Sequence, residues 1–164
     1  LRICEFYSRI SKTKFTIIRH SNIYGPHDKF DLEKSHVLGA TITKVMKAKK
    51  EIEIWGKGHE VRDFLYISDL LNFVKLIIKK QKSQFKIYNC GSGKGTKILD
   101  LVKLIIDISN KKIKIKKNTL APYIKFNLIL DSSKAINELG WKPMVDLHNG
   151  IRKTIFWWKK NYKN

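Results

Sequence analysis

Short β-branched runs alternate with amphipathic segments of helical length along the whole 164-residue chain. The run from Lys14 to Arg19 has the length and composition of a buried parallel strand. The same criteria predict further strands at 51–54, 61–67, 86–90, 113–116 and 126–130. Helical spacing of apolar residues predicts helices at 1–10, 35–50, 68–80, after 97, at 132–139 and after 146. Regular alternation without an internal repeat indicates the α/β class.

Two of the predicted helices begin at residues that commonly cap helix N-termini. Ser68 can accept a hydrogen bond from a first-turn amide, and Asp146 can do the same for the last helix. After Ser68 an apolar stripe follows, made of Leu70, Phe73, Val74, Ile77 and Ile78. Lys79 and Lys80 fall in the last turn, where positive charge is favourable to the helix dipole.

The chain is strongly basic, with 34 Lys and Arg against 14 Asp and Glu, a formal charge of +20. Only five of the basic residues are Arg and 29 are Lys. Arg is the residue that stacks and makes bidentate contacts, whereas scattered Lys usually forms a solvated face. A basic nucleic-acid-binding protein is therefore kept as an alternative, and nucleic acid is not the expected partner.

Several other classes are disfavoured by composition. The longest uncharged run, 35–43, is far shorter than the roughly 20 apolar residues of a membrane span, so no membrane partner is expected. Cys4 and Cys90 are far apart and suggest neither a disulfide framework nor a zinc site. A cytoplasmic location is the default expectation. The first residue is Leu1 and not Met, which hints at a processed or truncated product.

A glycine-rich stretch, GSGKG at 91–95, superficially resembles a nucleotide-binding loop. A P-loop requires Gly five residues before its Gly-Lys pair and Ser or Thr after it, and here Tyr88 and Gly95 occupy those positions. Thr96 stands where a G-x-G-x-x-G motif would end. The stretch is interpreted as a tight turn from a strand into a helix.

Arg62 lies between apolar residues in a predicted strand, which allows two interpretations. It either pairs with a carboxylate such as Asp63 or Asp69, or it faces an anionic group of a ligand. The five histidines form no H-E-x-x-H pair and no set with Cys at ligand spacing, so no metal site is expected. His36, near a helix start beside a polar loop, is more typical of a capping or hydrogen-bonding residue than of an acid or base.

Five stretches, taken in order, resemble one known family: TIIRHSNIYGP, SHVLGATITKVMK, IWGKGHEVRDFLYISDL, YNCGSG and LGWKPMVDLHNGIRKTIFWW. They are similar to the C-terminal half of the extended short-chain dehydrogenase/reductase family, the NAD(P)-dependent nucleotide-sugar epimerases and dehydratases. The SHV stretch is also similar to the GDP-fucose synthase branch. The resemblance covers essentially the whole chain.

The resemblance implies the C-terminal part of a Rossmann-type parallel sheet plus a small mixed α/β substrate-binding lobe. Residues 1–26 would end the dinucleotide-binding part, and 27–164 would be mainly the substrate-binding lobe, with 86–110 returning to the main sheet. Ligands of such sheets bind beyond the carboxyl ends of the strands.

By the same resemblance, several residues acquire expected roles. Asn22 is expected to contact substrate or cofactor, and His20, where the family often has Pro, to lie near the cofactor NAD or NADP. Arg62 is expected to face the diphosphate of a nucleotide diphosphate sugar. His36 matches a proton donor of the GDP-fucose synthase branch. A homodimer is expected for the complete enzyme.

The chain lacks two motifs that the family's chemistry needs, the Gly-rich cofactor loop and a Tyr-x-x-x-Lys pair. The helical stretch LRICEFYSRI fits the end of the helix that would carry that pair. The expected function is therefore the substrate-binding portion of a nucleotide-sugar epimerase, dehydratase or reductase, inactive alone. A stand-alone nucleotide-sugar-binding module and a basic nucleic-acid-binding protein are the alternatives.

Overall fold

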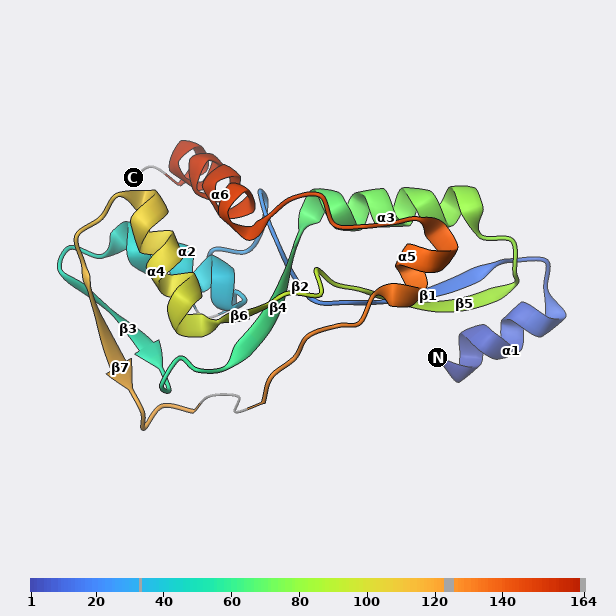
Figure 1. Cartoon of the computed structure of the whole chain (residues 1–164), viewed down its shortest axis with the longest axis horizontal. Helices are drawn as coiled ribbons and strands as arrows, with labels where there is room; N and C mark the ends of the chain where they lie inside the picture. The colour runs from blue at the N-terminus through green and yellow to red at the C-terminus, as the bar shows by residue number, and fades with distance from the viewer. Residues whose placement is uncertain (33, 123–125, 163–164) are drawn as a thin grey trace.

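The computed structural model of the chain describes residues 1–32, 34–122 and 126–162 and confirms the α/β class. The molecule is elongated and has a lobe at each end (Figure 1). Two strands, β2 (Asn22–Tyr24) and β4 (Val61–Tyr66), lie between the lobes and pair in parallel. These two strands carry most of the residues that the sequence singles out for ligand binding.

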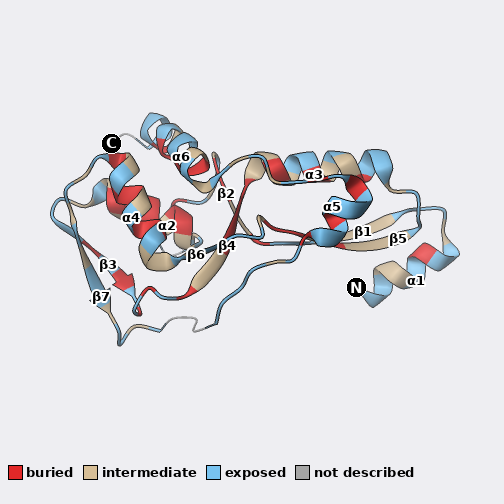
Figure 2. Ribbon diagram, viewed as in Figure 1, coloured by how far each residue is buried: buried red, intermediate tan, exposed pale blue. Residues whose placement is uncertain are grey.

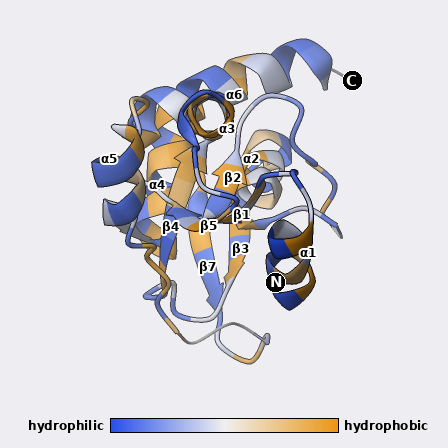
Figure 3. Cartoon of the chain, turned by 90° about the vertical axis from the view of Figure 1, so that its right-hand side faces the viewer, coloured by the Kyte–Doolittle hydropathy of each residue, from blue (hydrophilic) through white to orange (hydrophobic). Residues whose placement is uncertain are grey.

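The first lobe, called here the sheet lobe, is built on a parallel pair of strands. β1 (Phe15–His20) pairs with β5 (Phe85–Cys90), with Phe15 opposite Phe85 and His20 opposite Cys90. Helices α3 (Ile67–Lys80) and α5 (Ser133–Leu139) lie on one side of this pair, and α1 (Arg2–Ile10) lies on the other (Figures 1 and 3). The core of the lobe contains Leu65, Phe73, Ile77, Tyr88, Cys90, Ala135, Leu139 and Trp141.

The second lobe, called the helical lobe, packs three helices together: α2 (Val37–Lys47), α4 (Ile98–Ser109) and α6 (Leu147–Asn161). β3 (Glu51–Trp55) pairs in parallel with β7 (Lys114–Asn118), and β6 (Gly95–Lys97) pairs antiparallel with β4. Residues that are almost fully buried line the facing sides of the helices, as the red segments of Figure 2 show. They include Ile42, Val45, Leu101, Val102, Ile105, Ile151 and Ile155.

Most predicted elements are present, and Asp146 does cap α6, accepting a hydrogen bond from the Asn149 amide. The prediction that Ser68 caps α3 is wrong, because β4 runs directly into the helix and Tyr66 occupies the N-cap position. Ile78, predicted on the buried stripe of α3, is 79% exposed. The strand predicted at 126–130 is also wrong, since Leu128 makes only an isolated bridge with Arg62.

The segment predicted to return to the main sheet divides between the lobes. Within 86–110, β5 pairs with β1 in the sheet lobe, whereas α4 packs against α2 and α6 in the helical lobe. The turn between them, 91–94, therefore spans the middle of the molecule. Among the described residues, no helix is long and apolar enough to cross a membrane. The same residues contain no group of three His, Cys, Asp or Glu that could hold a metal ion.

Candidate functional site

The stretch TIIRHSNIYGP carries the chain from one sheet to another. β1 ends at His20, β2 begins at Asn22, and only Ser21 separates them. The Ser21 amide donates to the Cys90 carbonyl at 3.0 Å, which keeps the crossing attached to β5. From Asn22 the strand pairs with β4 instead, with Asn22 opposite Phe64. The carboxyl end of β1 is thereby placed beside the middle of β4.

A rigid turn follows the crossing. Tyr24 is 2% exposed and lies edge-to-face against Tyr66, with ring centroids 5.5 Å apart. Gly25 has a φ of 154°, and a Cβ there would lie 2.5 Å from Cγ2 of Ile67. Both the backbone angle and the lack of space require glycine, which agrees with the expectation that 24–26 form a rigid turn.

Asn22 and His20 each use one polar atom within the fold. The Asn22 side-chain amide donates to the Asp63 carbonyl at 2.9 Å. Nδ1 of His20 lies 2.8 Å from the Ser21 carbonyl, so in the neutral ring Nδ1 carries the proton. Among the described residues, neither the Asn22 side-chain oxygen nor the His20 Nε2 atom has a hydrogen-bond partner, so both remain acceptors where β1 ends and β2 begins. Both atoms suit contacts to hydroxyl or amide donors of a ligand.

Arg62 is held at the edge of β4 by backbone carbonyls. Its guanidinium donates to the Val61 carbonyl at 3.0 Å and to the Phe126 carbonyl, and it lies 5.5 Å from the centre of the Phe126 ring. The carboxylates proposed as its ion-pair partners are engaged by amides. Asp63 accepts from the Gly93 amide at 3.2 Å, and Asp69 accepts from the Val145 amide at 3.0 Å.

Asp63 is the residue of this region that the sequence analysis undervalued. It is fully buried, and its carboxylate accepts hydrogen bonds from the Ser92 amide and hydroxyl, the Gly93 amide and the Leu130 amide. The GSGKG stretch is therefore a turn that binds a carboxylate of its own chain. The signal available in the sequence was an acid in a strand pattern, directly followed by the apolar residues Phe64 and Leu65.

His36 occupies the N-cap position of α2, and its exposed side chain makes no capping hydrogen bond. The side-chain capping role considered for it is therefore wrong. Nearby Asp28 has a buried Oδ2 atom without a hydrogen-bond partner. Burial raises the pKa of the Asp28 carboxyl, and the Lys29 amide and the charge of His36 oppose that rise. His36 thus stands close enough to Asp28 for their charges to interact.

Asn22 bonds to the backbone of Asp63, the chain neighbour of Arg62, whereas the guanidinium of Arg62 contacts Phe126. His20 lies two residues before Asn22 at the end of β1. His36 enters from the separate helix α2, and none of the hydrogen bonds above involves it. The four predicted site residues therefore come from four elements: His20 from β1, Asn22 from β2, Arg62 from β4 and His36 from the start of α2.

Sequence comparison identifies the family to which these features correspond. The model of the NAD dependent epimerase/dehydratase family matches residues 1–91, more than half of the chain. The chain belongs to this family. The matched part contains β1, β2, β4 and β5, together with all four predicted site residues.

Relatives of known name support the assignment. The chain is 35% identical over 145 residues to a probable GDP-L-fucose synthase of Oryza sativa, covering 86% of this chain and 44% of that protein. It is 32% identical over 158 residues to the GDP-L-colitose synthase of Yersinia pseudotuberculosis, covering 93% and 51%. The chain thus spans about half the length of the curated relatives it matches.

A solved structure supports the fold. The UDP-glucose 4-epimerase of Thermotoga maritima, determined with UDP-glucose, superposes with a TM-score of 0.88 at 28% identity. The match covers 99% of this chain and 51% of that protein. The resemblance to the C-terminal half of the extended short-chain dehydrogenase/reductase family is therefore confirmed, as is the Rossmann-like fold class.

Proposed function

We propose that this chain is the substrate-binding portion of an NAD(P)-dependent nucleotide-sugar epimerase, dehydratase or reductase. The observation that carries the proposal is the bond from the Asn22 side chain to the Asp63 carbonyl, which holds a polar side chain just beyond the carboxyl end of β1 against β4, the strand that carries Arg62. Parallel sheets bind ligands beyond the carboxyl ends of their strands, and Arg is well suited to phosphate. The expected ligand is a nucleotide diphosphate sugar with its diphosphate facing Arg62.

The cofactor proposal assigns this chain a minor share of the NAD or NADP contacts. His20 and Asn22 fit such a share because each retains an acceptor atom at the end of β1. The Gly-rich loop and the Tyr-x-x-x-Lys pair are absent from the 164 residues, so we infer that the complete protein holds most of the cofactor outside this part and that this chain alone is inactive. When bound, the nicotinamide supplies hydride transfer.

Further assignments rest on the resemblance to relatives. His36 is proposed as a proton donor to the sugar, in keeping with its exposed position at the start of α2 and with the GDP-L-fucose synthases among the relatives. The divisions at 1–26 and 27–164 are proposed for the complete protein on the same basis, with only β5 of the segment 86–110 returning to the main sheet. A homodimer and a cytoplasmic location are proposed on this basis as well.

The first test is calorimetric titration of the 164-residue chain with GDP-sugars and UDP-sugars. Replacing Arg62 with Ala removes a charge-assisted contact worth about 1.5–3 kcal/mol, so the dissociation constant is expected to rise about tenfold or more. Arg152→Ala is the matched control, because Arg152 is an exposed arginine on α6 whose guanidinium donates to the Asn149 side chain. The control should bind like the parent chain.

Two outcomes would contradict the proposal. One is the absence of any nucleotide-sugar affinity in a chain whose circular dichroism and cooperative unfolding show that it is folded. The other is an equal loss of affinity in Arg62→Ala and Arg152→Ala, which would mean that only net charge matters. Either result would remove the nucleotide diphosphate sugar as the ligand of this junction.

A further inference from the structure

A basic pocket lies at the far end of the sheet lobe from the candidate site. Its volume is about 390 Å³, and its walls come from the end of α3, the start of β5 and α5. Three lysines line it, Lys80, Lys82 and Lys86. It faces the beginning of β5, whereas the candidate site lies at the strand ends marked by His20 and Cys90. No part of the proposed function uses it.

Two of the three lining ammonium groups, those of Lys80 and Lys86, are held in place by the fold. Nζ of Lys80 donates to the Leu139 carbonyl at 2.7 Å, and Nζ of Lys86 lies 2.8 Å from the Glu138 carboxylate. Just outside the lining, Nζ of Lys134 donates to the Ile87 carbonyl at 3.0 Å. Each ammonium has three donors, so each retains donors for a ligand. Lys82 makes no hydrogen bond or ion pair with the described part of the chain.

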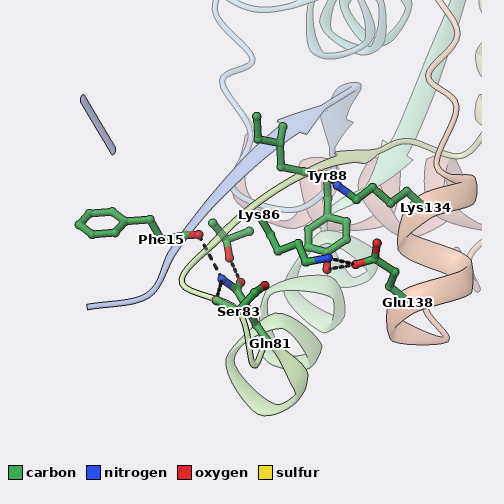
Figure 4. A network of polar contacts seen from close by, with 9 residues as sticks. Phe15, Gln81, Ser83, Lys86, Tyr88, Lys134 and Glu138 are labelled. Atoms are coloured by element: carbon green, nitrogen blue, oxygen red, sulfur yellow. Dashed lines mark hydrogen bonds and ion pairs between the residues drawn. The ribbon is translucent and has the colours of Figure 1, made fainter. Parts of the chain in front are cut away.

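A single carboxylate, Glu138, faces these lysines in the lining. Figure 4 shows Lys86 and Tyr88 pointing toward it, and the Tyr88 hydroxyl donates to it at 2.8 Å. Hydrogen bonds from Lys86 and Tyr88 lower the pKa of the Glu138 carboxyl, which is therefore ionised at neutral pH. One negative charge against three lysines leaves the lining with an excess of two positive charges.

The wall formed by the 81–84 loop is fixed to β1. The Gln81 side-chain amide donates to the Phe15 carbonyl at 3.1 Å and to the Ser83 carbonyl at 3.0 Å, as Figure 4 shows. The Thr16 hydroxyl donates to the Gln81 side-chain oxygen. Nζ of Lys14 reaches the Gln81 carbonyl at 3.2 Å, which adds a further positive charge behind this wall. The pocket is thus formed in advance, which reduces the ordering cost of binding.

We propose that this pocket binds a small, multiply charged phosphate compound of the size and charge of pyrophosphate. A concave surface with fixed, incompletely neutralised ammonium groups attracts anions, and lysine binds phosphate as a point charge. A multivalent ligand is indicated because several ammonium groups converge on a pocket that has only one carboxylate. The site is separate from Arg62 and shares no lining residue with the proposed nucleotide-sugar site.

The test is calorimetric titration of the 164-residue chain with pyrophosphate at constant ionic strength. Lys82→Gln is the decisive variant, because Lys82 is exposed and its side chain makes no hydrogen bond or ion pair within the described residues. The dissociation constant of this variant for pyrophosphate is expected to rise roughly fivefold. Lys103→Gln is the matched control, since Lys103 is exposed on α4 in the other lobe and the substitution removes the same charge. The control should leave affinity unchanged.

A second pair of variants reverses the sign of the effect. Glu138→Gln removes the only carboxylate of the lining and should tighten pyrophosphate binding roughly fivefold. Glu51→Gln changes the net charge equally at an exposed position on β3, and it should have no effect. Arg62→Ala should also leave pyrophosphate affinity unchanged, which separates this pocket from the proposed nucleotide-sugar site.

Several results would overturn the proposal. One is that the parent chain fails to bind pyrophosphate. Another is that Lys103→Gln and Glu51→Gln change the affinity as much as Lys82→Gln and Glu138→Gln do, which would mean that only the net charge of the chain matters. Loss of pyrophosphate binding in Arg62→Ala would place the anion at the other site. Tighter binding of a single-stranded oligonucleotide, weakened by Lys82→Gln, would identify this surface as a nucleic-acid site instead.

Discussion

At the scale of single residues, Asp63 links the parts of the candidate site. Its backbone carbonyl accepts from Asn22, and its buried carboxylate accepts from the turn that follows β5. One aspartate thus fixes the position of β2, of the turn at 91–94 and of the chain segment at Leu130. The positions of the residues proposed to bind ligand therefore depend on Asp63, which is not itself proposed to bind it.

We predict that Asp63→Asn destabilises the chain by about 2 kcal/mol, because both carboxylate oxygens accept hydrogen bonds and the amide would replace one acceptor with a donor. The midpoint of urea unfolding should fall while its slope stays constant. Asp107→Asn, at an exposed position on α4, should leave the midpoint within error. Equal midpoints for the parent chain and Asp63→Asn would show that these bonds add nothing to stability.

Residue roles of this kind could be predicted only in part. The pattern around Arg62 predicted a strand with a charged residue inside it, and that strand is β4. It left the partners of Arg62 and Asp63 open, because Phe126, which accepts from Arg62, and Ser92, which donates to Asp63, are far away in sequence and meet β4 only in the fold. His36 shows the same limit, since its position before a helix was predictable but the absence of a capping hydrogen bond was not.

At the scale of elements, the close packing of α6 against the NIYGP turn depends on Gly150. A Cβ at Gly150 would lie 2.1 Å from the Tyr24 hydroxyl and 2.8 Å from Cζ of the same ring. Tyr24 is buried between Phe64 and Tyr66 and has no space to withdraw. Helix α6 therefore positions the turn that leads to the candidate site.

We predict that Gly150→Ala lowers the free energy of unfolding by about 1–2 kcal/mol. Alanine is favoured over glycine inside a helix by at most about 1 kcal/mol, whereas overpacking typically costs about 1–3 kcal/mol, so the clash prevails. Adding Tyr24→Phe removes the nearest atom and should recover part of the loss, which a double-mutant cycle in urea would measure. A net gain in stability for Gly150→Ala alone would contradict the packing described here.

The elements differ in how well the sequence predicts them. α3, α4 and α6 were predictable because each places an apolar stripe at helical spacing over 12 residues or more. β2 and β6 contain three residues each, too few for a periodic pattern, and they exist because β4 pairs with them. The stretch 126–130 has strand composition but makes only one bridge, since local preference does not supply a pairing partner.

At the scale of the whole molecule, the two lobes have separate cores joined by β4. The sequence predicted the class and, through the family resemblance, the relation to half of a larger fold. It did not predict that α1 would bury so little. Ser8 is the buried residue of α1, whereas Ile3, Phe6 and Ile10 are 72%, 58% and 62% exposed. Figure 3 shows this helix standing at the edge of the lobe with hydrophobic segments in orange.

The exposed apolar residues of α1 indicate a surface that another protein segment covers. Nine residues are too few for a helix to be stable in water by itself, and the apolar residues at positions 3, 6 and 10 share one face. Contiguous exposed apolar surface of this kind promotes association. We predict that the 164-residue chain self-associates at micromolar concentrations, with a weight-average mass above that of the monomer in sedimentation equilibrium.

The double variant Ile3→Glu with Ile10→Glu should shift the chain toward the monomer, because it places two charges on the face that associates. Ile78→Glu with Phe156→Glu is the matched control: both residues are as exposed, at 79% and 73%, but they lie on separate helices, α3 and α6. The control should leave the mass unchanged. A monomeric parent chain, or an equal effect of the control, would mean that α1 is not the surface through which this chain meets other protein.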